Sequence, residues 1–209
     1  MYCKIPISIH RKKINNMAEA TKFTGKGTFK FPEGTYTGEF VDGIRQGYGI
    51  LKFSNYDIYD GDWKAGKMQG CGTYKFYDPV KDKHSSVYEG EFNHGVREGR
   101  GKIKYANHDV YVGLWQNDMK TGEGVYSFSD GRCFHGIWKF NKMIRGVMSF
   151  PNGNKYDGEI KSGKFEGYGK FYWNDGNWFE GIFKDGKPWK GILLTLEGNI
   201  TEYVEGVMK

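Results

Sequence analysis

The chain has 209 residues and a formal net charge of +6, and it combines 32 glycines and 36 aromatic residues (6 Trp, 15 Tyr and 15 Phe) with only 5 prolines. Disordered chains lack aromatic residues, and collagen requires glycine at every third position with abundant proline, so both classes are excluded. Helical bundles do not tolerate this much glycine, which costs about 1 kcal/mol per helix-interior site relative to alanine. The composition instead favours many short strands joined by tight turns.

The first residues carry one short apolar run, from Ile5 to Ile9, which is followed by the basic cluster Arg11–Lys13. In a secretory signal peptide the charges precede the apolar run, so this order does not fit one. No stretch approaches the roughly 18 apolar residues that a membrane-spanning helix needs. We interpret residues 1–20 as a disordered basic leader and residues 21–209 as the folded array.

A motif recurs about every 23 residues from Tyr36 onward. In its first copy, Tyr36 is followed by Gly38, Phe40 and the turn glycine Gly43, and a Gly-x-Gly pair comes next. The aromatic residues that begin the copies are Tyr36, Tyr59, Tyr88, Tyr111, Phe134, Tyr156 and Phe179. This spacing predicts about seven full repeats with partial units at both ends.

The alternation of side chains along a strand predicts the structure of one unit. Positions one, three and five (aromatic, glycine, aromatic) share a face, and the Gly-x-Gly pair of the following strand is expected on the same face. Each unit is therefore predicted to be a β-hairpin with one aromatic face, on which glycines leave room for large rings. Asp118 and Asn141 replace the turn glycine, and both residue types tolerate left-handed backbone. Between Tyr77 and Val87 the connection is longer, and this insert is either a partner contact or a tolerated surface loop.

The motif Tyr-x-Gly-x-Phe/Trp-x-x-Gly-x-x-x-Gly-x-Gly resembles the MORN repeat (membrane occupation and recognition nexus) over roughly residues 24–191. The resemblance implies an all-β fold: an elongated, twisted, single-layer antiparallel sheet built as a solenoid of successive β-hairpins. It also implies a scaffold or tether without enzymatic activity, because family members occur in cytoskeletal, ciliary and membrane-junction proteins.

The first candidate site is the aromatic face. A single-layer sheet cannot cover its rings fully, so we expect a partly exposed groove with tyrosine hydroxyls at its rim, suited to an extended peptide or a helix. The same rings must also form the core, and a purely structural role stays open. Its members are Tyr36, Phe40, Tyr59, Trp63, Tyr88, Phe92, Tyr111, Trp115, Phe134, Trp138, Tyr156, Phe179 and Phe183.

The second candidate site is a basic edge formed by the hairpin turns. Such an edge attracts anionic phospholipids, at about 1 kcal/mol per basic residue near the surface, or an acidic protein. A solvated rim that keeps the protein soluble is the other reading. Its members are Arg45, Lys64, Lys67, Arg97, Lys120, Lys139, Lys142, Lys161, Lys164, Lys184 and Lys187.

The sequence favours neither catalysis nor a cofactor. The three cysteines and five histidines have no metal-ligand spacing, so no metal site is predicted, and the far-apart cysteines indicate a reduced, intracellular protein. The Gly-x-Gly pairs lie within strands and are not phosphate loops, and no nucleic-acid motif appears. Two hypotheses remain: a cytoplasmic protein-binding scaffold of the cytoskeleton or cilium, and a peripheral membrane tether. Open sheet ends also predict an end-to-end homodimer.

Overall fold

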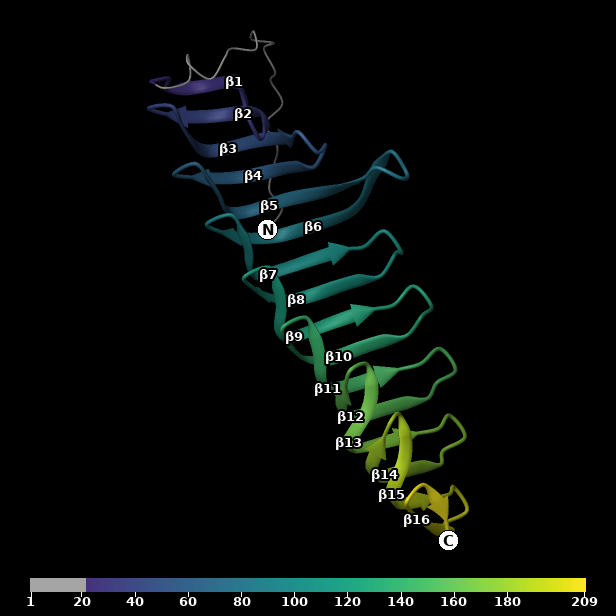
Figure 1. Cartoon of the computed structure of the whole chain (residues 1–209). Helices are drawn as coiled ribbons and strands as arrows, with labels where there is room; N and C mark the ends of the chain where they lie inside the picture. Colours follow the sequence, from purple (N-terminus) through teal and green to yellow (C-terminus); the bar gives the residue numbers. More distant parts are fainter. Residues whose placement is uncertain (1–21) are drawn as a thin grey trace.

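A computed structural model describes residues 22–209, and in it these residues form one antiparallel sheet of 17 strands (Figure 1). The strands are β1 (Gly25–Phe31), β2 (Gly34–Val41), β3 (Ile44–Phe53), β4 (Ile58–Lys64), β5 (Lys67–Asp78), β6 (Lys83–Asn93), β7 (Val96–Lys104), β8 (Val110–Gln116), β9 (Met119–Ser127), β10 (Cys133–Lys139), β11 (Lys142–Ser149), β12 (Lys155–Lys161), β13 (Lys164–Tyr172), β14 (Trp178–Lys184), β15 (Lys187–Leu194), β16 (Ile200–Val204) and β17 (Val207–Met208). The predicted basic leader at residues 1–20 lies outside the described residues.

Every strand pairs with its neighbours in the chain, so the sheet is a continuous meander. The described residues contain no helix, and consequently none that could cross a membrane. The sheet twists along its length and has a single layer (Figure 1). The predicted fold class, a single-layer solenoid of β-hairpins, is confirmed.

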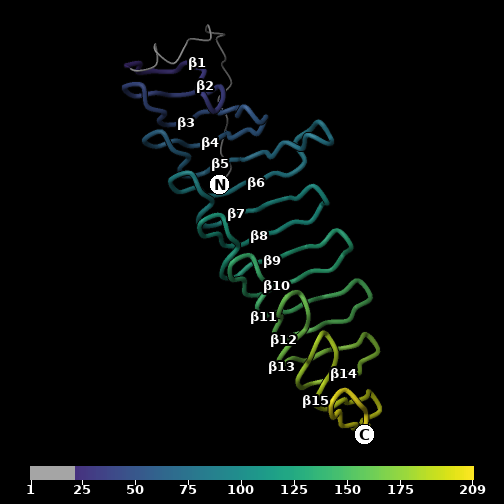
Figure 2. The backbone as a smooth tube through the Cα atoms, in the orientation of Figure 1, coloured from purple at the N-terminus to yellow at the C-terminus, as the bar shows by residue number. Residues whose placement is uncertain are grey.

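The turns inside the repeats follow the geometry that hairpins favour. Both central residues of the first turn have positive φ, at 49° for Asp42 and 77° for Gly43, which is the type I′ pattern that matches strand twist. Asp118 and Asn141 adopt φ values of 63° and 65°, as expected for residues that replace the turn glycine. These turns lie along one edge of the sheet, and the loops between repeats lie along the other (Figure 2).

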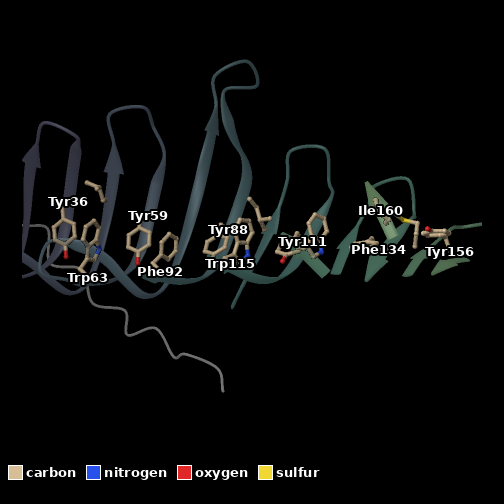
Figure 3. Packing of buried hydrophobic residues seen from close by; sticks show 14 of the residues in the cluster. Tyr36, Tyr59, Trp63, Tyr88, Phe92, Tyr111, Trp115, Phe134, Tyr156 and Ile160 are labelled. Atoms are coloured by element: carbon tan, nitrogen blue, oxygen red, sulfur yellow. The ribbon is translucent and has the colours of Figure 1, made fainter. Parts of the chain in front are cut away.

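The core is built from rings that lie across paired glycines. Gly38 and Gly49 face each other on adjacent strands, and a Cβ on Gly38 would lie 2.5 Å from both the Tyr36 hydroxyl and the Gly49 Cα. The Tyr36 ring occupies the space that a side chain would fill there. Other units repeat the arrangement, and Figure 3 shows the resulting row of rings on one side of the sheet.

The glycine that begins each Gly-x-Gly pair has a different role from the one predicted. Between β2 and β3 the register shifts after Gly38, which leaves Gly47 and Tyr48 as a bulge, and Gly47 has a φ of 63°. A Cβ on Gly47 would meet the carboxylate of Glu39, which belongs to the face opposite the rings. The prediction that this glycine makes room on the aromatic face was wrong, because the bulge interrupts the alternation.

The insert between Tyr77 and Val87 does not form an irregular loop. It extends the hairpin of β5 and β6 beyond its neighbours (Figure 1), with Asp78 paired to Lys83 at its end. At its tip Val80 is 92% exposed.

Candidate functional site

The predicted groove residues are the interior of the protein. Each of the thirteen has an exposed fraction of 5% or less, so the expectation of a partly exposed groove made of these rings was wrong. They are Tyr36, Phe40, Tyr59, Trp63, Tyr88, Phe92, Tyr111, Trp115, Phe134, Trp138, Tyr156, Phe179 and Phe183.

The polar atoms of these rings bond to the protein backbone and do not form a rim. The hydroxyl of Tyr111 donates to the carbonyl of Leu114 at 3.0 Å, and the indole N–H of Trp63 donates to the carbonyl of Gly49 at 3.0 Å. Burial raises the pKa of the Tyr111 hydroxyl to about 12. The first and fifth residues of each repeat therefore hold the sheet together, and an unaltered sheet does not present them to a partner.

A second set of aromatic side chains on the same face is only half-buried. They come from the last part of the second strand of each hairpin or from the residue just after it. They pack against the buried rings, and no second layer of the described residues covers them. The sequence placed them on the apolar face but gave no signal separating them from the interior rings. The set, called here the outer aromatic row, is Phe53, Tyr74, Phe76, Tyr105, Tyr126, Phe128, Phe150, Phe171 and Trp173.

Three residues of the predicted basic edge belong to the aromatic face. Each turn proper has only two residues, so the strands pair again at once: Arg45 lies opposite Phe40, Arg97 opposite Phe92, and Lys120 opposite Trp115. Each cation therefore shares a face with the ring that it pairs with. Assigning Arg45, Arg97 and Lys120 to a free turn edge was therefore wrong.

The two arginines are already paired. Arg45 forms an ion pair with Glu33 and lies 4.8 Å from the Trp63 ring. Arg97 lies 4.5 Å from the Trp115 ring, and its Nε lies 2.8 Å from the Asp118 carboxylate. Each arginine thus makes a cation–π contact with a ring and an ion pair with a carboxylate.

Lys120 lies among four rings. Its Nζ is 4.9 Å from the ring centre of Trp138, and it donates one hydrogen bond of 3.2 Å to the hydroxyl of Tyr105. Among the described residues no carboxylate lies within ion-pair distance of this ammonium. Burial, and then the nearby charge of Arg97, lower its pKa. The four rings are Tyr105, Tyr111, Tyr126 and Trp138.

The other eight predicted basic residues are exposed on the turn edge, where they form four directly opposed pairs. Like charges opposite each other across a ladder are destabilising, so these pairs do not serve the fold. Only Lys164 forms an ion pair within the described residues, with Asp185 at 2.8 Å. The pairs are Lys64 with Lys67, Lys139 with Lys142, Lys161 with Lys164, and Lys184 with Lys187.

Phe140 lies in the turn that joins one of these pairs, Lys139 and Lys142. Its φ is 49°, a strained value for a bulky residue, and its side chain is 62% exposed. Phe140 is not among the predicted site residues, although an aromatic residue at a position where other turns have Asp, Ala, His, Asn or Ser is a readable signal.

In the part of the chain that the structure describes, no cluster of His, Cys, Asp or Glu is arranged to hold a metal ion.

The geometry defines a class of protein: an open array of β-hairpin repeats whose exposed features are extended surfaces. The family model described as MORN repeat matches seven stretches, at residues 21–35, 36–58, 59–78, 88–110, 111–131, 134–155 and 156–178. The chain belongs to the MORN repeat family. MORN arrays of this kind are binding or scaffold modules. The hairpin that begins at Phe179 has the same form but lies beyond the matched stretches.

Two curated relatives match short parts of the chain. Alsin from Homo sapiens is 36% identical over 86 residues, which cover 38% of this chain and 5% of alsin. MORN repeat-containing protein 3 from Xenopus laevis is 35% identical over 72 residues, which cover 34% of this chain and 30% of that protein. The chain thus spans well under two thirds of either relative.

Among solved structures, a similar chain is the TCP domain of SAS-4 (dCPAP) from Drosophila melanogaster, in complex with a proline-rich motif of Ana2. The identity is 13% and the TM-score 0.47, with 96% of this chain and 98% of that chain covered.

Proposed function

We propose that this protein is a non-catalytic scaffold that binds a protein partner along its aromatic face. The observation that carries the proposal is the outer aromatic row, whose half-buried rings lie on a face that no second layer covers in the part of the chain that the structure describes. A row of aromatic side chains on an extended, rigid sheet suits an extended peptide or a helix, because large rings contribute contact area with little loss of side-chain freedom.

The position of the binding surface differs from the one the sequence predicts. The buried rings form the core of the sheet, and the outer aromatic row, which packs against them, makes the contact with the partner. Of the central members of this row, Tyr126 and Phe128 come from one repeat and Phe150 comes from the next. A partner that follows the array would meet one such cluster in each repeat, about 10 Å apart, since two strands at about 4.8 Å separate them.

Proximity labelling and pulldown from the native cell test the proposal. We expect Phe128→Ser to lose at least one partner that the unaltered chain captures, because the change removes apolar contact area from the outer aromatic row. Leu114→Ser is the matched control, since Leu114 is 38% exposed on the opposite face. Both variants are checked for folding by circular dichroism. If folded Phe128→Ser and Phe150→Ser keep every partner, the outer aromatic row is not the binding site.

For its setting in the cell we propose the cytoplasm, at the cytoskeleton or cilium, on the strength of family membership. An end-to-end homodimer is a further proposal, because within residues 22–209 β1 and β17 each have one edge that pairs with no strand. Light scattering of the purified chain tests it: a monomer at all concentrations would contradict it.

A second candidate function is a peripheral tether to anionic membranes, and a specific observation favours it. The opposed lysine pairs destabilise their own turns and would be stabilised by an anionic surface. Phe140 has a strained backbone and an exposed ring, and it lies between Lys139 and Lys142. An apolar residue flanked by basic residues in this way is suited to enter a lipid interface.

Vesicle sedimentation tests the tether. We expect binding to phosphatidylserine vesicles that weakens with salt, is lost in Lys139→Glu/Lys142→Glu, and is reduced in Phe140→Asn while the turn becomes more stable. Tyr56→Asn is the control, because Tyr56 is also exposed with a positive φ but lies on the opposite edge. An absence of binding at low salt would exclude the tether.

A further inference from the structure

Lys120 is a cation that the fold does not require. The same position of the next repeat holds Met143, which lies opposite Trp138 just as Lys120 lies opposite Trp115. An apolar side chain therefore satisfies this position in an otherwise similar hairpin. Lys120 places a charge there instead, in a half-buried site where burial disfavours the charged form.

The surrounding groups leave the ammonium only partly satisfied. Of its three N–H donors, one is used by the Tyr105 hydroxyl at 3.2 Å. Asp109 is the acidic residue whose charge acts on Lys120, and its oxygens are occupied: it accepts hydrogen bonds from the Tyr126 hydroxyl at 2.7 Å and from the Ser129 amide at 2.7 Å. It also accepts one from the Asn107 amide group at 2.9 Å.

The neighbouring cations differ in this respect. Arg45 and Arg97 each carry an ion pair, with Glu33 and Asp118 respectively. Along the aromatic face, Lys120 is therefore the cation among these three that has no carboxylate partner within the described residues. A ligand that follows the outer aromatic row would meet one unneutralised positive charge, close to Tyr105 and Tyr126.

We propose that Lys120 anchors a carboxylate of an acidic peptide segment that lies extended across the outer aromatic row. The chemistry is an Asp or Glu side chain on the ammonium, with apolar residues on either side that contact Tyr105, Phe128 and Phe150. One repeat corresponds to about 10 Å, or about three residues of an extended peptide, so these flanking residues lie about three positions from the acidic one. The inference rests on the proposed function and adds the partner's chemical class.

The charge on Lys120 gives the surface selectivity as well as affinity. Lys120 is half-buried among these rings, so a hydrogen bond from its ammonium to a carboxylate is stronger than one at an exposed lysine. A neutral peptide of the same shape would leave the ammonium covered and unpaired, which is unfavourable.

Selection of short random peptides displayed on phage, using the whole chain as bait, tests the inference. We expect the enriched peptides to carry an Asp or Glu between apolar residues. A synthetic peptide of the enriched sequence should then bind Lys120→Met about tenfold or more weakly than the unaltered chain, as for a hydrogen bond between charged groups. Lys142→Met is the matched control, because it removes an exposed lysine one turn away and should leave the affinity unchanged.

A double-mutant cycle gives the deciding measurement. Replacing the peptide's acidic residue by its amide should cost as much as Lys120→Met, and the two changes together should cost little more than either alone. Lys120→Gln serves as a second variant, and thermal denaturation confirms that both variants fold.

The outcomes separate the two proposals. Enriched peptides that lack acidic residues, or that bind Lys120→Met as well as the unaltered chain, overturn the role of Lys120 and leave the peptide-binding face standing. If no peptide is enriched and no cellular partner is captured, the proposed function fails and this inference fails with it. Loss of binding to phosphatidylserine vesicles in Lys120→Met, without any peptide effect, would assign the lysine to lipid and also overturn the inference.

Discussion

The repeats from β2 to β11 and those from β12 to β15 share one hairpin design, but the junction between these two regions differs from the junctions inside the first region. In the first region each turn donates a backbone N–H to the previous repeat: Gly66 to the carbonyl of Arg45 at 3.0 Å, and Gly95 to that of Met68 at 2.9 Å. Side chains add further links, as where Gln46 accepts a hydrogen bond from the amide of Ala65 at 3.0 Å.

The junction between β11 and β12 lacks these links. Among the described residues, the β12–β13 turn donates no backbone hydrogen bond to the previous repeat, and Ile144 stands where Gln46 accepts one. Ile160 also replaces a ring in the row of edge-to-face contacts. The links resume beyond it, where Gly186 donates to the carbonyl of Phe165 at 3.0 Å. Since repeat arrays are held together by contacts between neighbours, this junction is where the array separates most easily.

The largest expected effect comes from adding a Cβ beneath a ring of the first region. In Gly90→Ala the new atom would lie 2.5 Å from the Gly101 Cα and 2.6 Å from the Tyr88 hydroxyl, so we expect a loss of about 3 kcal/mol in the free energy of unfolding. Hydrogen exchange read by mass spectrometry should show faster exchange from β2 to β9 and little change from β12 to β15.

Gly95→Ala is the control for this variant. A Cβ there meets nothing within 4 Å, so only the φ of 97° is unfavourable, and we expect a cost of about 1 kcal/mol. Equal acceleration of exchange on both sides of Ile144 in Gly90→Ala would show that the junction is not a weak point.

A middle-sized effect should follow from restoring the side-chain hydrogen bond that the junction between β11 and β12 lacks. In Ile144→Gln the amide oxygen can accept the backbone N–H of Ser162, as Gln46 does for Ala65, so we expect the free energy of unfolding to rise by about 1 kcal/mol. Ile137→Gln is the matched control, since Ile137 is 44% exposed but does not face a turn. The midpoint of urea unfolding measures both, and an unchanged midpoint in Ile144→Gln would mean that the link alone does not set the difference.

The smallest effect concerns acid, and it depends on the loops at the other edge. Asp109 accepts the Ser129 amide of the next loop at 2.7 Å, and Asn154 makes the same link to the Asn174 amide at 2.9 Å. Burial opposes ionisation of Asp109, but the hydrogen bond from Tyr126 and those from the loop outweigh it and hold its pKa below the usual 3.8.

A lowered pKa in the folded state means that this stabilisation is present above about pH 4 and is lost as the pH falls through the folded-state value. Acid should therefore loosen the loop at Asp109 before the loop at Asn154, which does not titrate. Hydrogen exchange compared at pH 5 and about pH 3, corrected for the intrinsic rates, measures this, and Asp109→Asn should reduce the difference. Equal loosening of both loops would contradict it.

The sequence was sufficient for the hairpin, the aromatic face and the paired glycines, because all of these depend on a strict alternation that begins at Tyr36. It was insufficient at the turn edge, because the turn proper has only two residues and Arg45 is already paired in the ladder opposite Phe40. The same short turn places Lys120 opposite Trp115 and among its rings. Burial also exceeded expectation, because the tyrosine hydroxyls find acceptors on their own strands, as Tyr36 does at the carbonyl of Glu39. The identity of a residue does not predict which backbone carbonyl its hydroxyl will reach.

Because each described strand pairs only with the strands before and after it in the chain, no long-range closure fixes the number of hairpins. Duplicating or deleting one internal unit would lengthen or shorten the molecule by about 10 Å without altering the remaining units. The length of the array is therefore set by the number of copies of one short sequence segment.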